Sequence, residues 1–292
     1  MTTQAYLQAH TTPLNGKTVA ITGSTGGLGR ELVDHLAALG ASLILLDRNT
    51  ARSEALRDAL IARYGVSVRC IRLDLEDMDT VRAATDALSS LPLDVFIHNA
   101  GAYKIPRYTC ESGFDNVFQI NFAAPYTMIR ALLPTLRARH GHVVAVGSIA
   151  HNYSKIDKND MEFSMRHAPS KVYGNAKRHL IFSLLELFRN ETDATLSIVH
   201  PGITLTNMTA HFPKPIFTLI KHPMKIIFMS PRRASLSLLR GVFEPCSPDE
   251  WVGPRLWNVW GLPKKKKLRT ASGEERAEIA KRAEEIYERL LK

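Results

Sequence analysis

One glycine-rich turn limits what this 292-residue chain can fold into: Thr22-Gly23-Ser24-Thr25-Gly26-Gly27-Leu28-Gly29. An apolar run at residues 18–21 precedes the turn, and a helical pattern at residues 31–39 follows it. Glycines let the backbone turn sharply and approach a pyrophosphate, whose charge the N–H groups at the helix start can bind. The pattern therefore favours a dinucleotide ligand, although this glycine spacing alone also fits a tight connection without any ligand.

Strand and helix patterns alternate along the rest of the chain. Apolar runs predict strands at residues 42–46, 67–73, 94–97, 142–146 and 195–200, and an edge strand within 251–260. Helical patterns predict helices at residues 52–63, 78–88, 111–139 with a bend near Pro125, 171–188, 230–243 and 274–292. Strands alternating with helices form right-handed βαβ units. We therefore expect one α/β domain over residues 1–292, built on a single Rossmann-type doubly wound parallel sheet with helices on both faces.

Composition is that of an ordinary globular protein, with 45% hydrophobic and 23% charged residues. No stretch reaches the roughly 18 uninterrupted apolar residues of a membrane span. Residues 1–15 also lack the pattern of a signal peptide, so we expect a cytoplasmic protein. Cys70, Cys110 and Cys246 lie far apart without C-x-x-C spacing, which favours packing roles and predicts no metal site.

The formal charge of +10 is partly concentrated in Lys264-Lys265-Lys266-Lys267. Such a run can attract nucleic acid or an anionic membrane, but it is more often a solvated tail, which is the interpretation we favour. It lacks interleaved aromatic residues, so we expect no nucleic-acid partner. Residues 264–292 would then combine this basic tract with an amphipathic C-terminal helix, whose apolar face carries Ile279, Ala283, Ile286 and Leu290.

An acidic residue ends the second predicted strand. Asp47 follows Gly23 at about the 20-residue interval at which a carboxylate binds the adenosine ribose hydroxyls. This carboxylate should repel a 2′-phosphate, whereas the neighbouring Arg48 could bind one. We favour NAD as the cofactor, and NADP stays possible.

Polar residues also follow the fourth and fifth predicted strands. Asn99-Ala100-Gly101 and Ser148 stand at carboxyl ends, where a doubly wound sheet keeps its ligand crevice. Asn121 lies within an apolar helical run, where a buried amide must be hydrogen-bonded or costs about 1 to 3 kcal/mol. His98 could be a ligand, but a lone histidine at a strand end is more often structural.

Tyr173 and Lys177 are spaced to share one face of a helix. A phenol with a pKa of about 10 is a poor base near neutrality, and an adjacent ammonium would lower that pKa. The pair is therefore a candidate proton-transfer device, although the spacing alone arises by chance on many helices.

Taken in order, these motifs resemble the short-chain dehydrogenase/reductase family over about residues 15–206. By that resemblance Tyr173 is the catalytic acid/base, Lys177 lowers its pKa and holds the nicotinamide ribose, Ser148 orients the substrate oxygen, and Asn121 holds a relay water. The resemblance also implies a set of cofactor-binding residues: Gly23, Thr25, Gly27, Leu28, Gly29, Asp47, Arg48, Asp74, Leu75, Asn99, Ala100, Gly101, Tyr173, Lys177, Pro201, Gly202, Thr204 and Thr206.

Two departures from the family pattern, His98 and Gly147, fall outside the catalytic positions. The long interval from Ser148 to Tyr173 and the motif Ser148-Ile149-Ala150-His151 look like the retinol-dehydrogenase-type branch. This resemblance favours a bulky apolar alcohol or carbonyl substrate. A catalytically silent, dinucleotide-sensing regulator of the same fold is the alternative.

Residues 207–230 are apolar, basic and interrupted by prolines. Because they follow Thr206, we expect a substrate lid, and we consider association with a membrane surface the weaker alternative. The long helices at residues 111–139 and 173–189 could also form the interface of a homo-oligomer.

Overall fold

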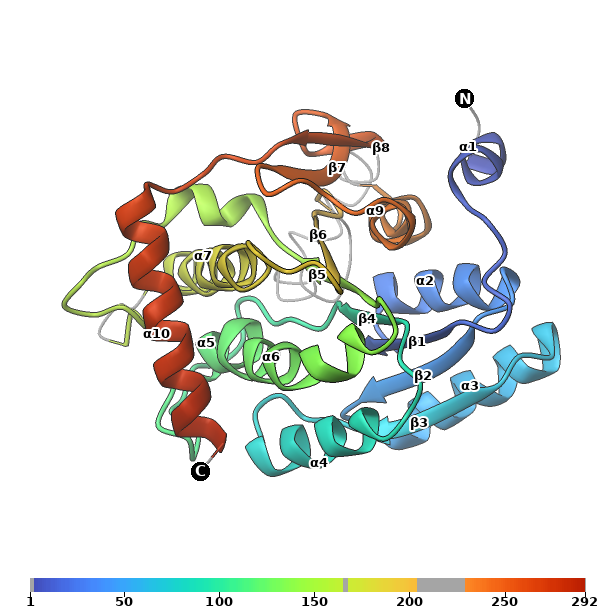
Figure 1. Cartoon of the computed structure of the whole chain (residues 1–292), viewed down its shortest axis with the longest axis horizontal. Coiled ribbons are helices and arrows are strands. Elements are labelled where there is room, and N and C mark those ends of the chain that lie inside the picture. The colour runs from blue at the N-terminus through green and yellow to red at the C-terminus, as the bar shows by residue number, and fades with distance from the viewer. Residues whose placement is uncertain (1–2, 165–167, 204–228, 292) are drawn as a thin grey trace, which may run out of the picture.

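The computed structural model describes residues 3–164, 168–203 and 229–291, which are arranged around one eight-stranded sheet (Figure 1). The strand order is β3-β2-β1-β4-β5-β6-β7-β8. Strands β1 to β7 pair in parallel, and β8 pairs antiparallel with β7. Their bounds are β1 Thr18–Thr22, β2 Ser42–Asp47, β3 Val68–Arg72, β4 Val95–His98, β5 His142–Val146, β6 Thr195–Val199, β7 Glu250–Leu256 and β8 Trp260–Lys267. The expected doubly wound parallel sheet is confirmed, with one antiparallel strand added at its edge.

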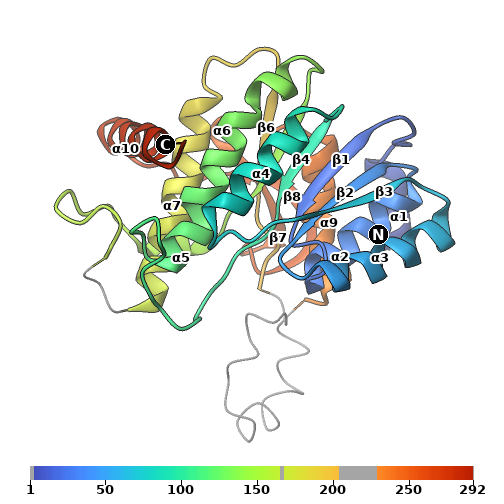
Figure 2. The same ribbon diagram turned by 90° about the horizontal axis from the view of Figure 1, so that it is seen from below.

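Helices cover both faces of this sheet, as Figure 2 shows. Side chains alternate between two buried clusters along each strand, so that Val19 and Ile21 enter one cluster while Ala20 enters the other. The cluster with Val19 is completed by α1 Thr3–His10, α2 Gly27–Ala38, α3 Thr50–Tyr64 and α9 Pro231–Phe243. The other cluster is completed by α4 Met78–Ser89, α5 Asn116–Phe118, α6 Ala124–Arg137, α7 Pro169–Leu187 and α10 Gly273–Leu291. Because helices bury both faces of the sheet, the central strands are continuous runs of apolar residues.

The helix predicted at residues 111–139 is shorter and less regular than expected. It begins after Asp115, whose carboxylate caps it by accepting from the backbone N–H groups of Val117 and Phe118. The irregularity is a π-helical turn, η1 Gln119–Ala123, that lies just before Pro125 and joins α5 to α6. A π turn widens the helix locally and is frequent at functional sites.

The C-terminal helix α10 buries the face that the sequence predicts, Ile279, Ala283, Ile286 and Leu290. It packs across α6 and α7 (Figure 1). A bidentate ion pair at 2.6 Å fixes it, because the Arg178 guanidinium of α7 donates to both carboxylate oxygens of Glu275. The two helices that we considered for an oligomer interface are therefore covered here by the chain itself.

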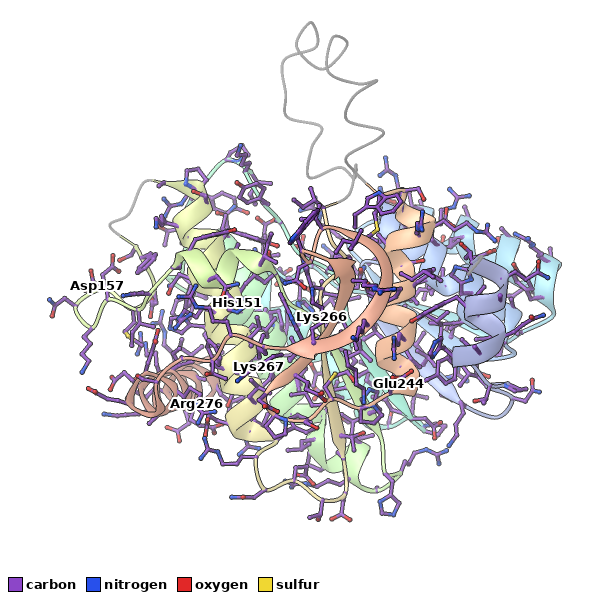
Figure 3. All side chains as sticks on the ribbon, turned by 90° about the horizontal axis from the view of Figure 1, so that it is seen from above. His151, Asp157, Glu244, Lys266, Lys267 and Arg276 are labelled. Atoms are coloured by element: carbon purple, nitrogen blue, oxygen red, sulfur yellow. The ribbon has the colours of Figure 1, made fainter. Side chains whose placement is uncertain are left out.

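The interpretation of residues 264–267 as a solvated tail is wrong. They form the end of β8, paired with β7 (Figure 3). The ammonium groups of Lys265 and Lys266 donate to the backbone carbonyls of Pro245 and Pro254. These residues are therefore held both by strand pairing with β7 and by side-chain hydrogen bonds. The proposed lid at residues 207–230 lies almost wholly outside the described residues. Among the described helices, none has the length and apolar character needed to cross a bilayer.

Candidate active site

The glycine turn joins β1 to α2 with very little space around its backbone. Gly23 has φ +69°, in the left-handed region that favours glycine. A Cβ on Gly29 would lie 2.1 Å from the Gly23 carbonyl oxygen and 2.9 Å from the Ser24 Cα. The helix begins at Gly27, and its N-cap residue Gly26 has no side chain to bind the first N–H groups. The turn thus leaves helix donors at the carboxyl end of β1, which fits a bound pyrophosphate.

Asn99 holds this turn in place from the neighbouring strand. Its Nδ2 donates to the carbonyl oxygens of Thr22 and Gly23, each at 3.0 Å. The Thr22 hydroxyl in turn accepts from the backbone N–H groups of Asn99 and Ala100 at 3.1 and 3.0 Å. The Asn99-Ala100-Gly101 segment therefore connects the glycine turn to the end of β4 by hydrogen bonds. This agrees with its predicted position at the carboxyl end of a strand.

Asp47 faces the same turn from the end of β2. Its side chain is buried and accepts three hydrogen bonds, from the Ser24 hydroxyl at 2.5 Å and from the Thr25 N–H and hydroxyl at 3.1 and 2.9 Å. A carboxylate has about four acceptor positions. One position is thus left for a further donor such as a ribose hydroxyl.

Arg48 points the other way and is paired. Its Nη1 lies 3.0 Å from Oε2 of Glu76, a residue that the sequence analysis did not single out. Glu76 follows Asp74 and Leu75, and the Asp74 carboxylate accepts from the Glu76 N–H at 3.1 Å. The only sequence signal for Glu76 is its position directly after Asp74 and Leu75, two of the residues that the family resemblance implies for cofactor binding.

Asn121 lies in the π turn and is fully buried. Its Nδ2 donates to the carbonyl oxygens of Ala102 and Val117 at 2.8 Å, and its Oδ1 accepts from the Ala102 N–H at 3.3 Å. A Cβ on Gly101 would lie 2.9 Å from Asn121 Oδ1 and 3.6 Å from Lys177 Nζ. The side chains of Asn121 and Lys177 therefore both lie next to Gly101, in the loop after β4.

Tyr173 and Lys177 lie on α7, and Ser148 lies two residues after β5. The Ser148 side chain is close enough to the Tyr173 hydroxyl to act on its pKa. The Lys177 Nζ donates to the Val146 carbonyl oxygen at 2.9 Å and lies 6.0 Å from the centroid of the Tyr173 ring. Tyr103, which the sequence analysis missed, stacks obliquely on Tyr173 with 5.0 Å between ring centroids. The structure thus brings together the tyrosine, lysine, serine and asparagine that the motifs predicted.

The electrostatics of this cluster differ from expectation. Burial raises the pKa of Tyr173 to about 12, and the Ser148 side chain acts in the opposite direction without reversing it. Burial also lowers the pKa of Lys177 to about 7. Lys177 is only 2% exposed and is turned toward a backbone carbonyl. The expected lowering of the Tyr173 pKa by Lys177 is therefore not seen in this structure.

The buried lysine should make stability depend on pH. An unfolded lysine has a pKa of about 10.4, so between about pH 7 and pH 10 the unfolded chain binds more protons than the folded one. The free energy of unfolding should therefore rise with pH in this window, by about 2 kcal/mol from pH 7 to pH 9. Urea unfolding of wild type and Lys177→Met at several pH values checks this. The variant should lack the rise, and parallel curves would contradict it.

The remaining predicted residues are only partly described. Gly202 has φ +85°, and a Cβ there would lie 2.7 Å from the Val259 carbonyl oxygen, so Pro201-Gly202 packs against the β7–β8 hairpin. Thr204 and Thr206 lie outside the described residues. His98 is buried, contacts the Thr22 hydroxyl at 3.3 Å, and has its pKa held well below the ordinary value by burial. Within the described residues, no three His, Cys, Asp or Glu side chains gather as a metal site would require.

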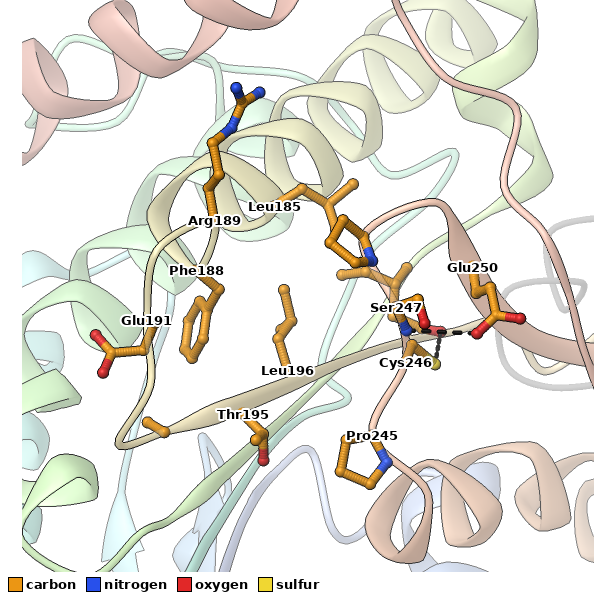
Figure 4. A pocket seen from close by; sticks show the side chains of 13 residues that line it. Leu185, Phe188, Arg189, Glu191, Thr195, Leu196, Pro245, Cys246, Ser247 and Glu250 are labelled. Carbon is orange, nitrogen blue, oxygen red and sulfur yellow. Dashed lines mark hydrogen bonds between the residues drawn. The ribbon is translucent and has the colours of Figure 1, made fainter.

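A separate cavity of about 230 Å³ lies at the opposite end of α7 and β6 (Figure 4). Its lining includes Leu185, Phe188 and Cys246 but none of the four candidate catalytic residues. Burial raises the pKa of the Cys246 thiol, which keeps it protonated near neutrality. This cavity is not part of the candidate active site.

Comparison with known proteins agrees with this geometry. Residues 17–215 match the model of the short chain dehydrogenase family. Retinol dehydrogenase 14 from Homo sapiens is 30% identical over 287 residues, which cover 84% of this chain and 85% of that protein. Polyprenol dehydrogenase from Mus musculus is 28% identical over 256 residues, covering 83% of this chain and 76% of that protein.

Solved structures give the same fold. A crystal structure of an uncharacterised protein from Mycobacterium paratuberculosis superposes with a TM-score of 0.75 and 26% identity, covering 97% of this chain and 96% of that one. A short-chain dehydrogenase from Sphingobium yanoikuyae, solved in complex with NADPH, superposes with a TM-score of 0.55 and 24% identity. This superposition covers 66% of this chain and 74% of the Sphingobium yanoikuyae chain.

Proposed function

The chain belongs to the short-chain dehydrogenase family, and from this premise we propose that it interconverts a bulky apolar alcohol and the corresponding carbonyl compound with a nicotinamide cofactor. The observation that carries the proposal is the cluster of Ser148, Tyr173 and Lys177: Ser148 is close enough to act on the Tyr173 pKa, and Lys177 Nζ lies 6.0 Å from the centroid of the Tyr173 ring. Few arrangements place a proton donor, a second hydroxyl and a buried amine at the carboxyl edge of a sheet, beside a glycine turn.

The residues around the turn fit a dinucleotide. The absence of side chains at Gly23 and Gly29 lets the turn fold tightly, and the N-terminus of α2 offers its donors there. Asp47 keeps one acceptor position for a ribose hydroxyl, and Lys177 offers protons of its ammonium group close to Gly101 and Asn121. When bound, the nicotinamide exchanges a hydride with the substrate carbon.

The chain's own residues then handle the proton and the oxygen. In reduction the Tyr173 hydroxyl gives its proton to the carbonyl oxygen, and in oxidation the phenolate takes the alcohol proton. Ser148 donates a hydrogen bond to the same oxygen and so stabilises its developing charge. Lys177, held by the Val146 carbonyl, favours the phenolate whenever its amine is protonated.

An apolar surrounding supports the substrate class. Tyr173 packs against a small cluster that contains Val117, Phe163 and Val172. Apolar packing against the Tyr173 ring favours an apolar over a sugar-like substrate at this hydroxyl. The names of two relatives, retinol dehydrogenase and polyprenol dehydrogenase, refer to long apolar alcohols in those proteins.

The activity test is a screen of NADH oxidation with apolar ketones and aldehydes, together with NAD reduction by the matching alcohols. We expect turnover with at least one bulky apolar pair and little with sugars. Cofactor binding without turnover across such a panel would favour the catalytically silent regulator instead.

We also propose NAD rather than NADP as the preferred cofactor. Asp47 is buried beside the turn as a carboxylate, so a 2′-phosphate placed there would meet a like charge. Calorimetric titration should therefore give a lower Kd for NADH than for NADPH. Asp47→Asn keeps the side-chain shape and removes the charge. This substitution should bring the Kd values for NADH and NADPH closer together. Tighter binding of NADPH by the wild type would overturn this preference.

A further inference from the structure

Arg48 is the cation closest in sequence to the proposed ribose-binding carboxylate, yet its guanidinium is already paired. The side chain is 68% exposed, and its Nη1 lies 3.0 Å from Oε2 of Glu76. This pair joins the segment after β2 to the segment after β3. Arg48 therefore does not stand as a free cation at the place where a 2′-phosphate would have to be bound.

Glu76 is the fixed partner of the two. Its side chain is only 16% exposed. Its Oε1 accepts from Nδ2 of the fully buried Asn116 at 3.2 Å. Glu76 is also close enough to the Tyr108 hydroxyl to raise the pKa of this phenol. Asn116 is itself anchored, because the same Nδ2 donates to the Pro106 carbonyl at 3.0 Å. A rigid carboxylate thus sets the position of a long, exposed and otherwise flexible arginine.

Glu76 also lies close to Asp74, one of the residues that the family resemblance implies for cofactor binding. Glu76 and Asp74 line one cavity of about 630 Å³ together with Tyr108. Arg30 and Arg52 line a different hollow, together with Thr25.

We propose that Glu76 determines the cofactor preference by holding the Arg48 guanidinium away from the adenosine 2′ position. The proposal rests on the proposed function, since it concerns the dinucleotide of that same site. Arg48 can bind a 2′-phosphate only after the Glu76 carboxylate has released its guanidinium. A 2′-hydroxyl does not require this step, so NAD binds without disturbing the pair.

The test is a double-mutant cycle measured by calorimetric titration of NADPH and NADH. Glu76→Gln keeps an acceptor for Asn116 and removes the charge. We expect its Kd for NADPH to fall by about fivefold, because the exposed ion pair that holds Arg48 is removed, while its Kd for NADH changes by less than about twofold. In the background of Arg48→Met, the same substitution should change the Kd for NADPH by less than about twofold.

Asp58→Asn is the matched control. It removes one carboxylate on α3, where the side chain is 67% exposed and pairs with Arg57. Screening should keep its effect on the Kd for NADPH below about twofold. Thermal midpoints of all variants show whether a change in binding reflects a change in folding.

Three results would overturn the inference. An unchanged or weaker affinity of Glu76→Gln for NADPH would mean that Glu76 does not restrain Arg48, or that it orients Arg48 for phosphate. A gain that persists in the Arg48→Met background would mean that Glu76 acts by direct repulsion. Failure of every variant to bind either dinucleotide would overturn the proposed function as well, whereas intact NADH binding confines the failure to Glu76.

Discussion

Replacing Tyr173 by phenylalanine should lower turnover by about 10²- to 10⁴-fold while cofactor binding persists. The substitution keeps the ring that packs near Tyr103 and removes the hydroxyl on which Ser148 acts. The substitution therefore removes the group that we propose passes the proton to the substrate oxygen. Single-turnover rates with a saturating apolar substrate, together with NADH titration, separate the chemical step from binding.

Tyr153→Phe is the matched control for this experiment. Tyr153 ends the short helix that follows Ser148, and it is 66% exposed. Loss of its hydroxyl should leave turnover within about threefold, because an exposed phenol makes little net contribution. Near-native turnover of Tyr173→Phe on a good substrate would show that another group supplies the proton.

Replacing Gly29 by alanine should weaken dinucleotide binding by at least about 100-fold and lower the thermal midpoint by several degrees. The added Cβ would lie 2.1 Å from the Gly23 carbonyl oxygen and 2.9 Å from the Ser24 Cα, both backbone atoms that cannot move alone. Relief of this clash must shift the turn or α2, and overpacking of this kind costs about 1 to 3 kcal/mol or more. The helix donors would no longer face the pyrophosphate.

Gly273→Ala gives the corresponding control at another helix start. A Cβ on Gly273 would meet nothing within 4 Å, and α10 begins at this residue. Its stability should be unchanged or slightly higher, because alanine has the better helix propensity. Calorimetric titration of NADH and thermal melts of both variants test this prediction. A normal NADH affinity of Gly29→Ala would refute a role of the turn in dinucleotide binding.

The fold could be predicted because its signals are local. Continuous apolar strands, amphipathic helices and a glycine turn each follow from neighbouring residues. The bounds of β5 and the end of α9 at Phe243 agree with the sequence patterns. The gathering of Asn121, Ser148, Tyr173 and Lys177 also follows, because the carboxyl ends of parallel strands meet at one edge.

What could not be predicted depends on contacts between distant segments. The pairing of Arg48 with Glu76 needs the register of β2 beside β3, and the raised pKa of Tyr173 needs the burial around α7. The π turn at residues 119–123 has no distinct sequence pattern, because its residues also fit an α-helix. The lysines at 264–267 had the composition of a tail, yet pairing with β7 made them a strand.

The placement of those lysines has a consequence for contact between separate molecules. The sheet has two outer strands, β3 and β8, and the outer strand of a sheet offers unpaired backbone groups that can pair with another chain. Arg69 and Arg72 are exposed on β3, and Lys264 and Lys267 are exposed on β8. Two copies that approach edge to edge therefore bring cations together whichever edges meet. The basic tract protects the sheet from adding strands of a second molecule, and high salt, which screens these charges, would weaken that protection.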